Sequence, residues 1–383
     1  MTVVWNYPTR IVFGEKAMVQ TADELKRLGG SRALIATDPG IAAAGLSEQL
    51  RAQLEQDGVE AVVFDGIAGN PTDEHALAAA AAYKAARADS VIAIGGGSAL
   101  DIGKLIRLLA THDEPLERYD DAKGGSARIK GPLPPMIALP TTAGTGSEVG
   151  RSAVATMRET GRKTVFFSPL LLPNVAILDP LLTVSMPPHV TAATGFDALT
   201  HCVEAYCSPF DHPMADAIAL EGIRLVAAHL LNAVRDGKNL EARGAMLKAA
   251  AFGATAFQKG LGACHSLAHP LSAEFGTHHG LANALCLPAV LDFNRSVVED
   301  RLATIARKLG VRAEDDESLA FECSGAIRAL RHRLELPEGL GAAGIPESGL
   351  SKLADLAFED PCHHENPREC SRDDLLKLYQ ASF

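Results

Sequence analysis

The first part of the chain alternates short apolar segments with segments whose apolar residues recur at helical spacing. Short apolar runs that end in turn residues are typical of buried strands, and recurrence at three and four residues is typical of helices. This alternation predicts an α/β domain with a parallel sheet flanked by helices on both faces. We expect strands at residues 9–13, 32–37, 59–64, 90–94 and 135–140, and helices at 16–28, 45–56, 73–88 and from 95 onward.

The pattern changes after Pro187-Pro188. Before this point, two further short strands are expected within 163–179, and residues 114–134 have the composition of an exposed connection. Beyond it, nearly every segment has helical spacing. The predicted helices cover 189–207, 212–236, 239–258, 261–275, 279–293, 297–309, 315–333, 348–358 and 372–381. We place a domain boundary near residue 185, with an α/β domain at 1–185 and an all-helical domain at 186–383.

Composition and charge limit the functional classes. A chain of 383 residues is longer than one hydrophobic core usually supports, which agrees with two domains. The net charge of −11 argues against binding to nucleic acid or to an anionic membrane. The sequence shows neither a secretory signal nor an apolar run that would span a bilayer, so we expect a cytoplasmic protein. The seven cysteines are not arranged as CxxC pairs, and neither a disulfide framework nor a zinc ribbon is indicated.

The turn Gly95-Gly96-Gly97-Ser98 is a candidate phosphate-binding loop, because it follows an apolar strand and begins a helix. Glycine lets the backbone approach an anion, and a helix N-terminus offers free N–H groups. An ordinary tight turn is the alternative. A second loop, from Thr141 to Glu148, could close over a pyrophosphate or a ribose, or it could be a surface loop whose hydroxyl groups bind each other. Asp38 follows a strand at the end of the sheet where ligands bind.

Four of the thirteen histidines lie between Gly262 and Gly280. His265 and His269 are four residues apart and share a helix face, and a turn could fold His279 back toward them. Asp197 and His201 form a second pair at the same spacing. One carboxylate with several imidazoles suits a divalent iron, zinc, manganese or cobalt ion. The alternative is that each histidine is an ordinary core or capping residue.

A dinucleotide in one domain and a Lewis-acid metal in the other would suit hydride transfer in the cleft between them. The metal draws electron density from a carbonyl oxygen while a nicotinamide supplies hydride to the carbon. His269 could carry the proton, or it could have only a packing role.

Four segments of the chain resemble the iron-containing (group III) alcohol dehydrogenases. They are Gly95 to Lys104, Pro140 to Glu148, Thr194 to Tyr206 and His265 to Gly280, and Asn70-Pro71-Thr72 and Asn366-Pro367-Arg368 occur in the expected order. The resemblance implies a Rossmann-like N-terminal domain and a helical C-terminal domain, as in the dehydroquinate synthase-like architecture. It also implies that Asp197, His201, His265 and His279 bind iron, and that His269 lies beside the nicotinamide.

The resemblance further implies that NAD is the cofactor and that Asp38 lies at the adenosine ribose. A carboxylate there would accept hydrogen bonds from the ribose hydroxyls and repel a 2′-phosphate, which favours NAD over NADP. Asp197 and His269 are the expected catalytic residues. The residues expected to bind the cofactor are Asp38, Asn70, Gly96, Gly97, Ser98, Asp101, Thr141, Thr142, Thr145 and Lys163.

Two positions depart from the family pattern. His278 stands where proline is common, so two adjacent histidines compete as ligand, and we choose His279 because it directly precedes Gly280. Arg151 stands where a small residue is usual. A guanidinium near the substrate would favour an anionic substrate, because it pairs bidentately with a carboxylate. A structural ion pair is the alternative.

We therefore expect an NAD-linked, metal-dependent oxidoreductase that interconverts a small primary alcohol and its aldehyde, such as a hydroxy acid and its semialdehyde. The metal is expected to be Fe(II), with Zn(II) or Mn(II) as alternatives, and the protein is expected to form a homodimer or a larger homo-oligomer. A dehydroquinate synthase-like or glycerol dehydrogenase-like enzyme is the second hypothesis. A nucleotide-binding protein without activity is the third, and the complete ligand set argues against it.

Overall fold

The computed structural model describes Tyr7 and residues 9–383, and its contacts divide the chain into two compact units. The sheet unit comprises Tyr7–Thr142 and Gly146–Ser185. The helical unit comprises Met186–Phe383 and the short segment Ala143–Thr145.

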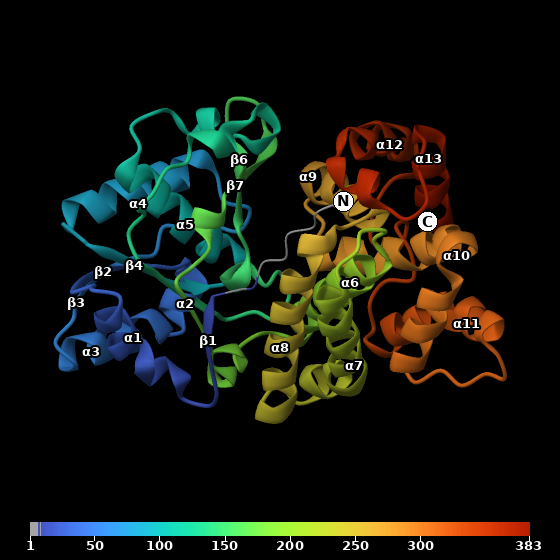
Figure 1. Cartoon of the computed structure of the whole chain (residues 1–383), viewed down its shortest axis with the longest axis horizontal. Helices are drawn as coiled ribbons and strands as arrows, with labels where there is room; N and C mark the ends of the chain where they lie inside the picture. Colours follow the sequence, from blue (N-terminus) through green and yellow to red (C-terminus); the bar gives the residue numbers. More distant parts are fainter. Residues whose placement is uncertain (1–6, 8) are drawn as a thin grey trace. The chain divides into compact units, whose positions relative to one another are not determined.

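The sheet unit is built on six parallel strands, in the order β1-β8-β5-β4-β2-β3 (Figure 1). Parallel neighbours need long crossovers, and helices supply them. The strands are β1 (Arg10–Phe13), β2 (Arg32–Ala36), β3 (Glu60–Phe64), β4 (Ser90–Gly95), β5 (Met136–Pro140) and β8 (Val175–Leu178). The predicted parallel α/β arrangement is confirmed.

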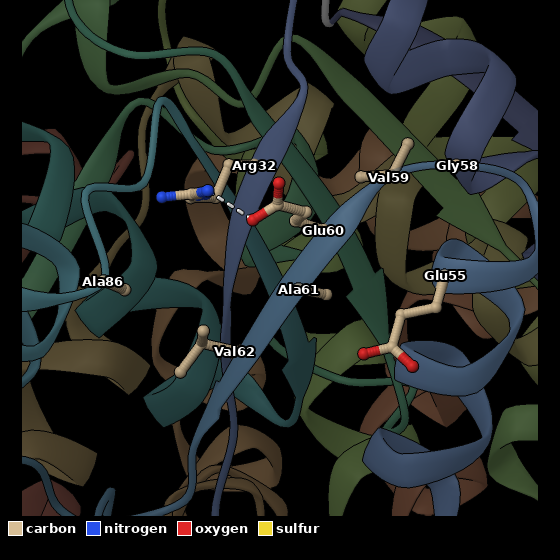
Figure 2. Close-up of a pocket in the computed structure, with 8 residues that line it drawn as sticks. All are labelled: Arg32, Glu55, Gly58, Val59, Glu60, Ala61, Val62 and Ala86. Atoms are coloured by element: carbon tan, nitrogen blue, oxygen red, sulfur yellow. Dashed lines mark ion pairs between the residues drawn. The ribbon is translucent and has the colours of Figure 1, made fainter.

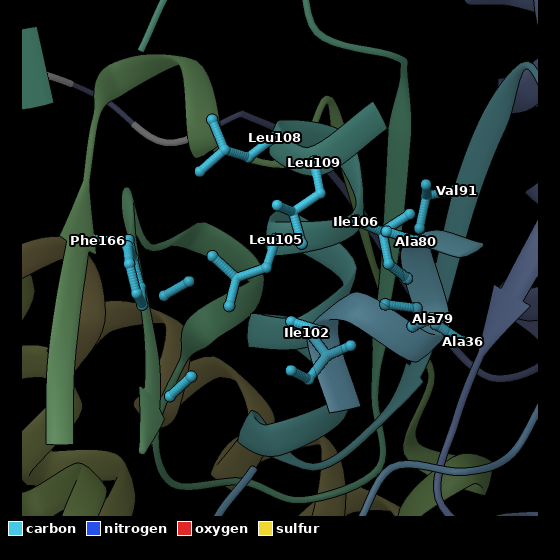
Figure 3. Close-up of a cluster of buried hydrophobic side chains, with 14 of the residues drawn as sticks. Ala36, Ala79, Ala80, Val91, Ile102, Leu105, Ile106, Leu108, Leu109 and Phe166 are labelled. Carbon is cyan, nitrogen blue, oxygen red and sulfur yellow. The ribbon is translucent and has the colours of Figure 1, made fainter. Parts of the chain in front are cut away.

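Two hydrophobic layers cover the two faces of this sheet, with α4 (Asp73–Ala85) and α5 (Gly97–Thr111) on one face and α1 (Thr21–Arg27) and α3 (Leu46–Gln56) on the other (Figure 1). Figure 3 shows the first layer, where Ile102, Leu105 and Ile106 of α5 lie in one cluster with side chains of the sheet and α4. Apolar residues at helical spacing thus bury α5 along much of its length, which fixes the glycine turn that precedes it.

The sheet unit differs from the sequence prediction in four details. Strand β7 (Arg162–Phe167) does not join the parallel sheet but pairs antiparallel with β6 (Ser152–Met157), which we did not predict. The alternating burial of β6 is carried by small residues such as Ala153 and Ala155, so its hydrophobic pattern is weak. The segment 114–134 is not simply exposed, because it contains three 3-10 helices and buries Leu116 and Tyr119. The short helix α2 (Pro39–Ala43) was also missed.

The helical unit contains α6 (Pro188–Cys207), α7 (Pro213–Arg235), α8 (Leu240–Ala256), α9 (Ala263–Phe275), α10 (His279–Lys308), α11 (Asp316–Arg333), α12 (Leu350–Glu359) and α13 (Arg372–Ala381). Short 3-10 helices occur in both units: η1 (Ala17–Gln20), η2 (Leu116–Tyr119), η3 (Asp121–Lys123), η4 (Gly125–Arg128), η5 (Ser147–Val149), η6 (Pro169–Leu171), η7 (Pro180–Thr183), η8 (Phe257–Lys259), η9 (Glu347–Gly349) and η10 (Pro361–Glu365). Helix α10 consists of two helices joined at a kink at Val298, where the backbone is not helical (φ −135°, ψ 33°). The division into two helices, expected between residues 293 and 297, is therefore confirmed, although the break lies at Val298.

Helix α6 is the central element of the helical unit, since nearly all of its residues are buried. It packs against α7, α8 and α10. Helix α7 is long and apolar enough, by length and composition, to cross a membrane. Its apolar residues Ile223, Val226 and Leu230 are buried in this bundle, which accounts for its composition.

Candidate functional site

Helix α6 presents a row of polar side chains on one buried face. Asp197, His201 and Glu204 are spaced at four and three residues, so they lie one above another. The Nε2 atom of His201 lies 3.7 Å from Oδ1 of Asp197. Polar groups in a helix core are costly unless they have partners. The partners of these three residues come from α9 and α10.

Helix α9 contributes His265, whose ring is fixed by Glu204. The Nδ1 atom of His265 donates to Oε2 of Glu204 at 2.5 Å, and the backbone N–H of Cys264 donates to Oε1 at 2.7 Å. Because Nδ1 carries the donated proton, Nε2 of His265 keeps its lone pair, as a metal ligand requires. Glu204 thus sets both the tautomer and the orientation of this imidazole.

Helix α10 begins at His279 and lies close against α6 at Gly280. A Cβ atom on Gly280 would lie 2.0 Å from the carbonyl oxygen of Ala193, so only glycine fits. This approach places Nε2 of His279 3.5 Å from Oδ1 of Asp197. One turn later, the side-chain amide of Asn283 donates to the same carboxylate oxygen at 3.0 Å.

The ligand atoms of Asp197, His265 and His279 all lie within 4.8 Å of one another. Burial lowers the pKa of His265 and of His279 well below the usual range, so both rings are neutral at pH 7. Burial alone would raise the pKa of Asp197, but the nearby histidines outweigh it and the pKa is lowered. One carboxylate and neutral imidazoles are the donor set of a divalent transition metal. Asp197, His265 and His279 therefore fit a divalent transition-metal ion.

The other predicted residues of the helical unit take distinct places. His201 faces Asp197 through Nε2, while its buried Nδ1 has no hydrogen-bond partner among the residues that the structure describes. Of the two adjacent histidines, His279 joins Asp197 and His278 precedes the first turn of α10. The ring of His269 stacks on His279 with centroids 5.3 Å apart, and its Nδ1 donates to Asp360 at 2.7 Å.

In the sheet unit, the glycine turn lies at the switch point of the strand order. The chain leaves β2 toward β3 and leaves β4 toward β5, in opposite directions, so a crevice opens between the carboxyl ends of β2 and β4. Gly95, with φ +153°, brings the backbone so close that an added Cβ would lie 3.2 Å from Oδ2 of Asp38. The structure thus brings Asp38 to the glycine turn.

Thr141 and Thr142 reach the same turn from β5. The N–H of Thr141 donates to the carbonyl of Gly95 at 2.9 Å, and a Cβ on Gly96 would lie 3.4 Å from the side chain of Thr142. Gly97 and Ser98 open α5, where backbone N–H groups point outward from the helix N-terminus.

The other predicted cofactor residues are not brought together at the glycine turn. They are Asp101, Lys163, Asn70 and Thr145. The Asp101 carboxylate accepts from Ser147 Oγ at 2.5 Å and from Val154 N at 3.0 Å, so it ties α5 to the β6–β7 hairpin. Lys163 lies on that hairpin, and burial lowers the pKa of its ammonium group. Asn70 takes a left-handed conformation, with φ +53°, ahead of α4. Thr145 belongs to the helical unit.

Arg151 lies beside the hairpin and has no carboxylate partner among the described residues. Its guanidinium carbon lies 5.2 Å from the ring centroid of Phe167. Burial lowers the pKa of its guanidinium group. The structural ion pair that was the alternative explanation for this arginine is therefore not found in the described part of the chain.

A depression at the start of β3 lies away from these residues (Figure 2). It is lined by Arg32 and Glu60, which form an ion pair, and by residues of the turn before β3. Arg32 and Glu60 begin parallel strands, whereas the glycine turn follows the end of one. The depression therefore lies at the end of the sheet opposite the switch point.

Comparisons with known proteins agree with this architecture. Residues 8–180 match the model of the iron-containing alcohol dehydrogenases, and residues 191–383 match the C-terminal model of the Fe-containing alcohol dehydrogenase family. The chain therefore belongs to the iron-containing alcohol dehydrogenase family, and it is a metal-dependent oxidoreductase of alcohols and aldehydes. The resemblance inferred from the sequence motifs is confirmed.

Individual relatives cover nearly the whole chain. A 4-hydroxybutyrate dehydrogenase from Cupriavidus necator is 41% identical and aligns over 98% of this chain and 99% of its own length. The crystal structure of a 1,3-propanediol oxidoreductase superposes with a TM-score of 0.96 at 36% identity, covering 100% of both chains. A sulfoacetaldehyde reductase from Bifidobacterium kashiwanohense, solved in complex with NAD+, has a TM-score of 0.88 at 30% identity and covers 100% of this chain and 98% of its own.

Three residues around the metal ligands were not identified from the sequence. Glu204 lies three residues after His201, so its shared helix face was a usable signal. Asn283 follows His279 by four residues and could have been found in the same way. Asp360 is 91 residues from His269, and no spacing rule connects them.

Proposed function

We propose that this enzyme interconverts an ω-hydroxy carboxylic acid and the corresponding semialdehyde, with NAD(H) as cofactor and iron as the bound metal. The metal chemistry is supported by one observation above all. Asp197, His265 and His279 converge within the helical unit, and Glu204 fixes the His265 tautomer that leaves Nε2 free.

When bound, the metal polarises the C–O bond of the substrate, and the nicotinamide accepts or supplies the hydride. The residues of this chain prepare that reaction. Asp197 brings a buried negative charge to the ligand set, and the neutral imidazoles leave the metal able to attract the substrate oxygen. Asn283 holds the Asp197 carboxylate in place through its 3.0 Å bond. His269, held by Asp360, is positioned to pass the alcohol proton toward solvent.

Several features support NAD over NADP. Asp38 lies at the switch point beside the glycine turn, where its Oδ1 caps α2 by accepting from Gly40 N and Ile41 N. Its second oxygen is free of these two bonds and can accept from ribose hydroxyl groups. The negative charge of the Asp38 carboxylate would repel a 2′-phosphate at this position. Binding of NAD+ by the sulfoacetaldehyde reductase relative is in accord with this proposal.

The proposal of an acidic substrate rests on Arg151. A half-buried guanidinium that has no carboxylate partner in residues 9–383 retains the capacity to bind one, and the ring of Phe167 limits its movement. The names of two relatives, a 4-hydroxybutyrate dehydrogenase and a sulfoacetaldehyde reductase, describe enzymes of anionic substrates. Arg151 would then recognise the end of the substrate that does not react.

The test compares acidic and neutral aldehydes of similar length. Arg151→Ala is expected to lower kcat/KM for succinic semialdehyde by roughly 10- to 100-fold, the loss of one charge-assisted contact, and to leave butyraldehyde within about twofold. Steady-state oxidation of NADH measures both. Arg158→Ala, an exposed arginine of the same hairpin paired with Glu74, is the matched control and should change neither substrate.

Two outcomes would contradict this role for Arg151. Equal losses for both aldehydes would show a general structural effect. A selective rise in the KM for NADH would show that the guanidinium binds the cofactor instead of the substrate.

We further propose that the protein works in the cytoplasm as a homodimer or a larger homo-oligomer. All seven cysteines are free, and six of them are buried, which suits a reducing compartment. Among the strands of the described residues, β1 pairs with β8 on one side only, which leaves an edge to be covered. Light scattering of the purified protein tests the oligomeric state.

A further inference from the structure

A second group of metal-binding side chains lies next to the ligand set described above and shares no residue with it. It consists of His269 on α9, Asp360 at the end of α12 and Cys362 in η10. One imidazole nitrogen, one carboxylate oxygen and one sulfur lie within 4.8 Å of one another. His269 is the most exposed of the three, with 38% of its side chain accessible, so solvent and ions can reach the group from its side.

Asp360 holds this group together. Its Oδ2 accepts from His269 Nδ1 at 2.7 Å, and its Oδ1 accepts from Ser266 Oγ at 2.8 Å and from the backbone N–H of Cys362 at 2.9 Å. The carboxylate is therefore fixed by two segments that are distant in the sequence. The backbone of His363 in turn donates to Ser266 Oγ at 2.8 Å, which ties η10 to α9. A scaffold held in this way is preorganised for an ion.

We propose that His269, Asp360 and Cys362 form a second divalent metal site, selective for ions that accept sulfur, such as Zn(II) and Co(II). Nitrogen, oxygen and sulfur donors together are the ligand set of a borderline-soft ion. Three protein ligands and a solvent-exposed side leave a fourth position for water. The first ligand set differs in kind, because it contains no sulfur.

Binding at this site has a simple proton balance. The Cys362 thiol loses its proton to solvent, and the proton on His269 Nδ1 moves to Nε2 or to solvent. Burial raises the pKa of Cys362 well above the usual range, so the thiol is protonated without a metal, and coordination removes the proton. The hydrogen bond between His269 and Asp360 is replaced by two bonds to the ion.

An ion at this second site would change the role of His269 in the reaction, and this part of the inference rests on the proposed function. The His269 ring stacks on His279, so an ion at the second site would lie beside the first ligand set. Excess zinc at the second site would then coordinate Nδ1 of His269 and replace the hydrogen bond between this nitrogen and Asp360. The spectroscopic test below does not depend on turnover, so its failure would leave the proposed reaction untouched.

Cobalt distinguishes the two sites, because only a thiolate ligand gives a sulfur-to-Co(II) charge-transfer band in the near ultraviolet. We would titrate Co(II) into the iron-loaded enzyme under anaerobic conditions and follow this band. It is expected to saturate at one Co(II) per chain and to disappear when Zn(II) is added. Cys362→Ser should abolish the band, and Cys370→Ser, a buried thiol bonded to Arg368 O nearby, should keep it.

A further variant guards against misfolding of Cys362→Ser. His269→Ala keeps the sulfur but removes the nitrogen, and it is expected to lower the apparent affinity for Co(II) by about tenfold or more. Circular dichroism and iron content establish that each variant is folded. Absence of the band in the wild-type enzyme at a large excess of Co(II), or a band that persists in Cys362→Ser, would overturn the proposal.

Discussion

Two buried glutamates, Glu204 and Glu148, differ in the hydrogen bonds that their carboxyl groups accept. Glu204 holds His265 by one oxygen and the N-terminus of α9 by the other. Glu148, in the sheet unit, is also fully buried, but within the described part of the chain its Oε1 has no hydrogen-bond partner. Burial raises the pKa of both carboxyl groups to about 7, but only Glu204 has a hydrogen-bond partner on each oxygen, so only Glu204 orients another side chain.

Replacing Glu204 by glutamine should weaken metal binding. The amide keeps one acceptor oxygen, so either His265 Nδ1 or Cys264 N faces an NH2 group and the ring loses its fixed tautomer. Metal affinity is expected to fall about 10- to 100-fold, as for other residues that orient a ligand. Competition with a chelator of known affinity measures this. Glu365→Gln, a half-buried carboxylate bonded to Leu261 N, is the control and should bind metal normally.

Glu148 should make stability depend on pH. Burial raises its pKa from 4.5 to about 7, while its own backbone and Lys104 lower the pKa by less. The folded state therefore retains the proton that the unfolded state has lost, and stability falls as pH rises from about 4.5 to about 7. Glu148→Gln should remove this slope and be more stable than the wild type at pH 8, by an amount on the order of 2 kcal/mol. Urea unfolding at pH 5 and pH 8 tests it, and parallel slopes in both proteins would contradict it.

At the scale of elements, close helix contacts place the ligands. His279 reaches Asp197 because α10 begins against α6, where Gly280 meets the carbonyl of Ala193. The ligand geometry is therefore a product of backbone packing as well as of side-chain identity.

Gly280→Ala should push α10 away from α6. The added Cβ would meet a backbone oxygen at 2.0 Å, which no side-chain rotation relieves. We expect a loss of roughly 1–3 kcal/mol in the free energy of unfolding, together with weaker metal binding. Gly325→Ala, on α11 with no contact nearer than 3.6 Å, is the control and should be neutral or stabilising by up to about 1 kcal/mol. Similar losses in both variants would mean that helix propensity, and not the contact, is responsible.

At the scale of the whole molecule, a metal held by the four proposed ligands would link three helices of one unit. Asp197 and His201 come from α6, His265 from α9 and His279 from α10. An ion that binds only the folded state stabilises it according to the ratio of its concentration to Kd.

Removal of the metal should therefore lower the unfolding temperature. Free metal at a thousandfold excess over Kd contributes about 4 kcal/mol, or roughly 10 °C for a unit of this size. Calorimetry of chelated and reconstituted protein measures the difference. His279→Ala should lose the response to metal, and His278→Ala should keep it. The reverse result would assign the ligand to His278.

Most of the elements and the family were accessible from the sequence, because they follow from local periodicity and from spacing within single segments. Turns of the helix place Asp197 with His201, and the apolar strand before Gly95 indicates a phosphate loop. Strand β6 was missed because alanine gives little alternation, and the exposed connection was misjudged because 3-10 turns have no strong pattern.

What the sequence alone determined was which chemistry is available: a carboxylate, imidazoles, a glycine turn and an unusual arginine. The tertiary structure decided which of these groups meet. Glu204 holds a ring 61 residues away, Asp360 holds one 91 residues away, and His279 rather than His278 reaches Asp197. Such contacts depend on how helices pack against one another, and packing is set by the whole bundle, so no local spacing encodes them.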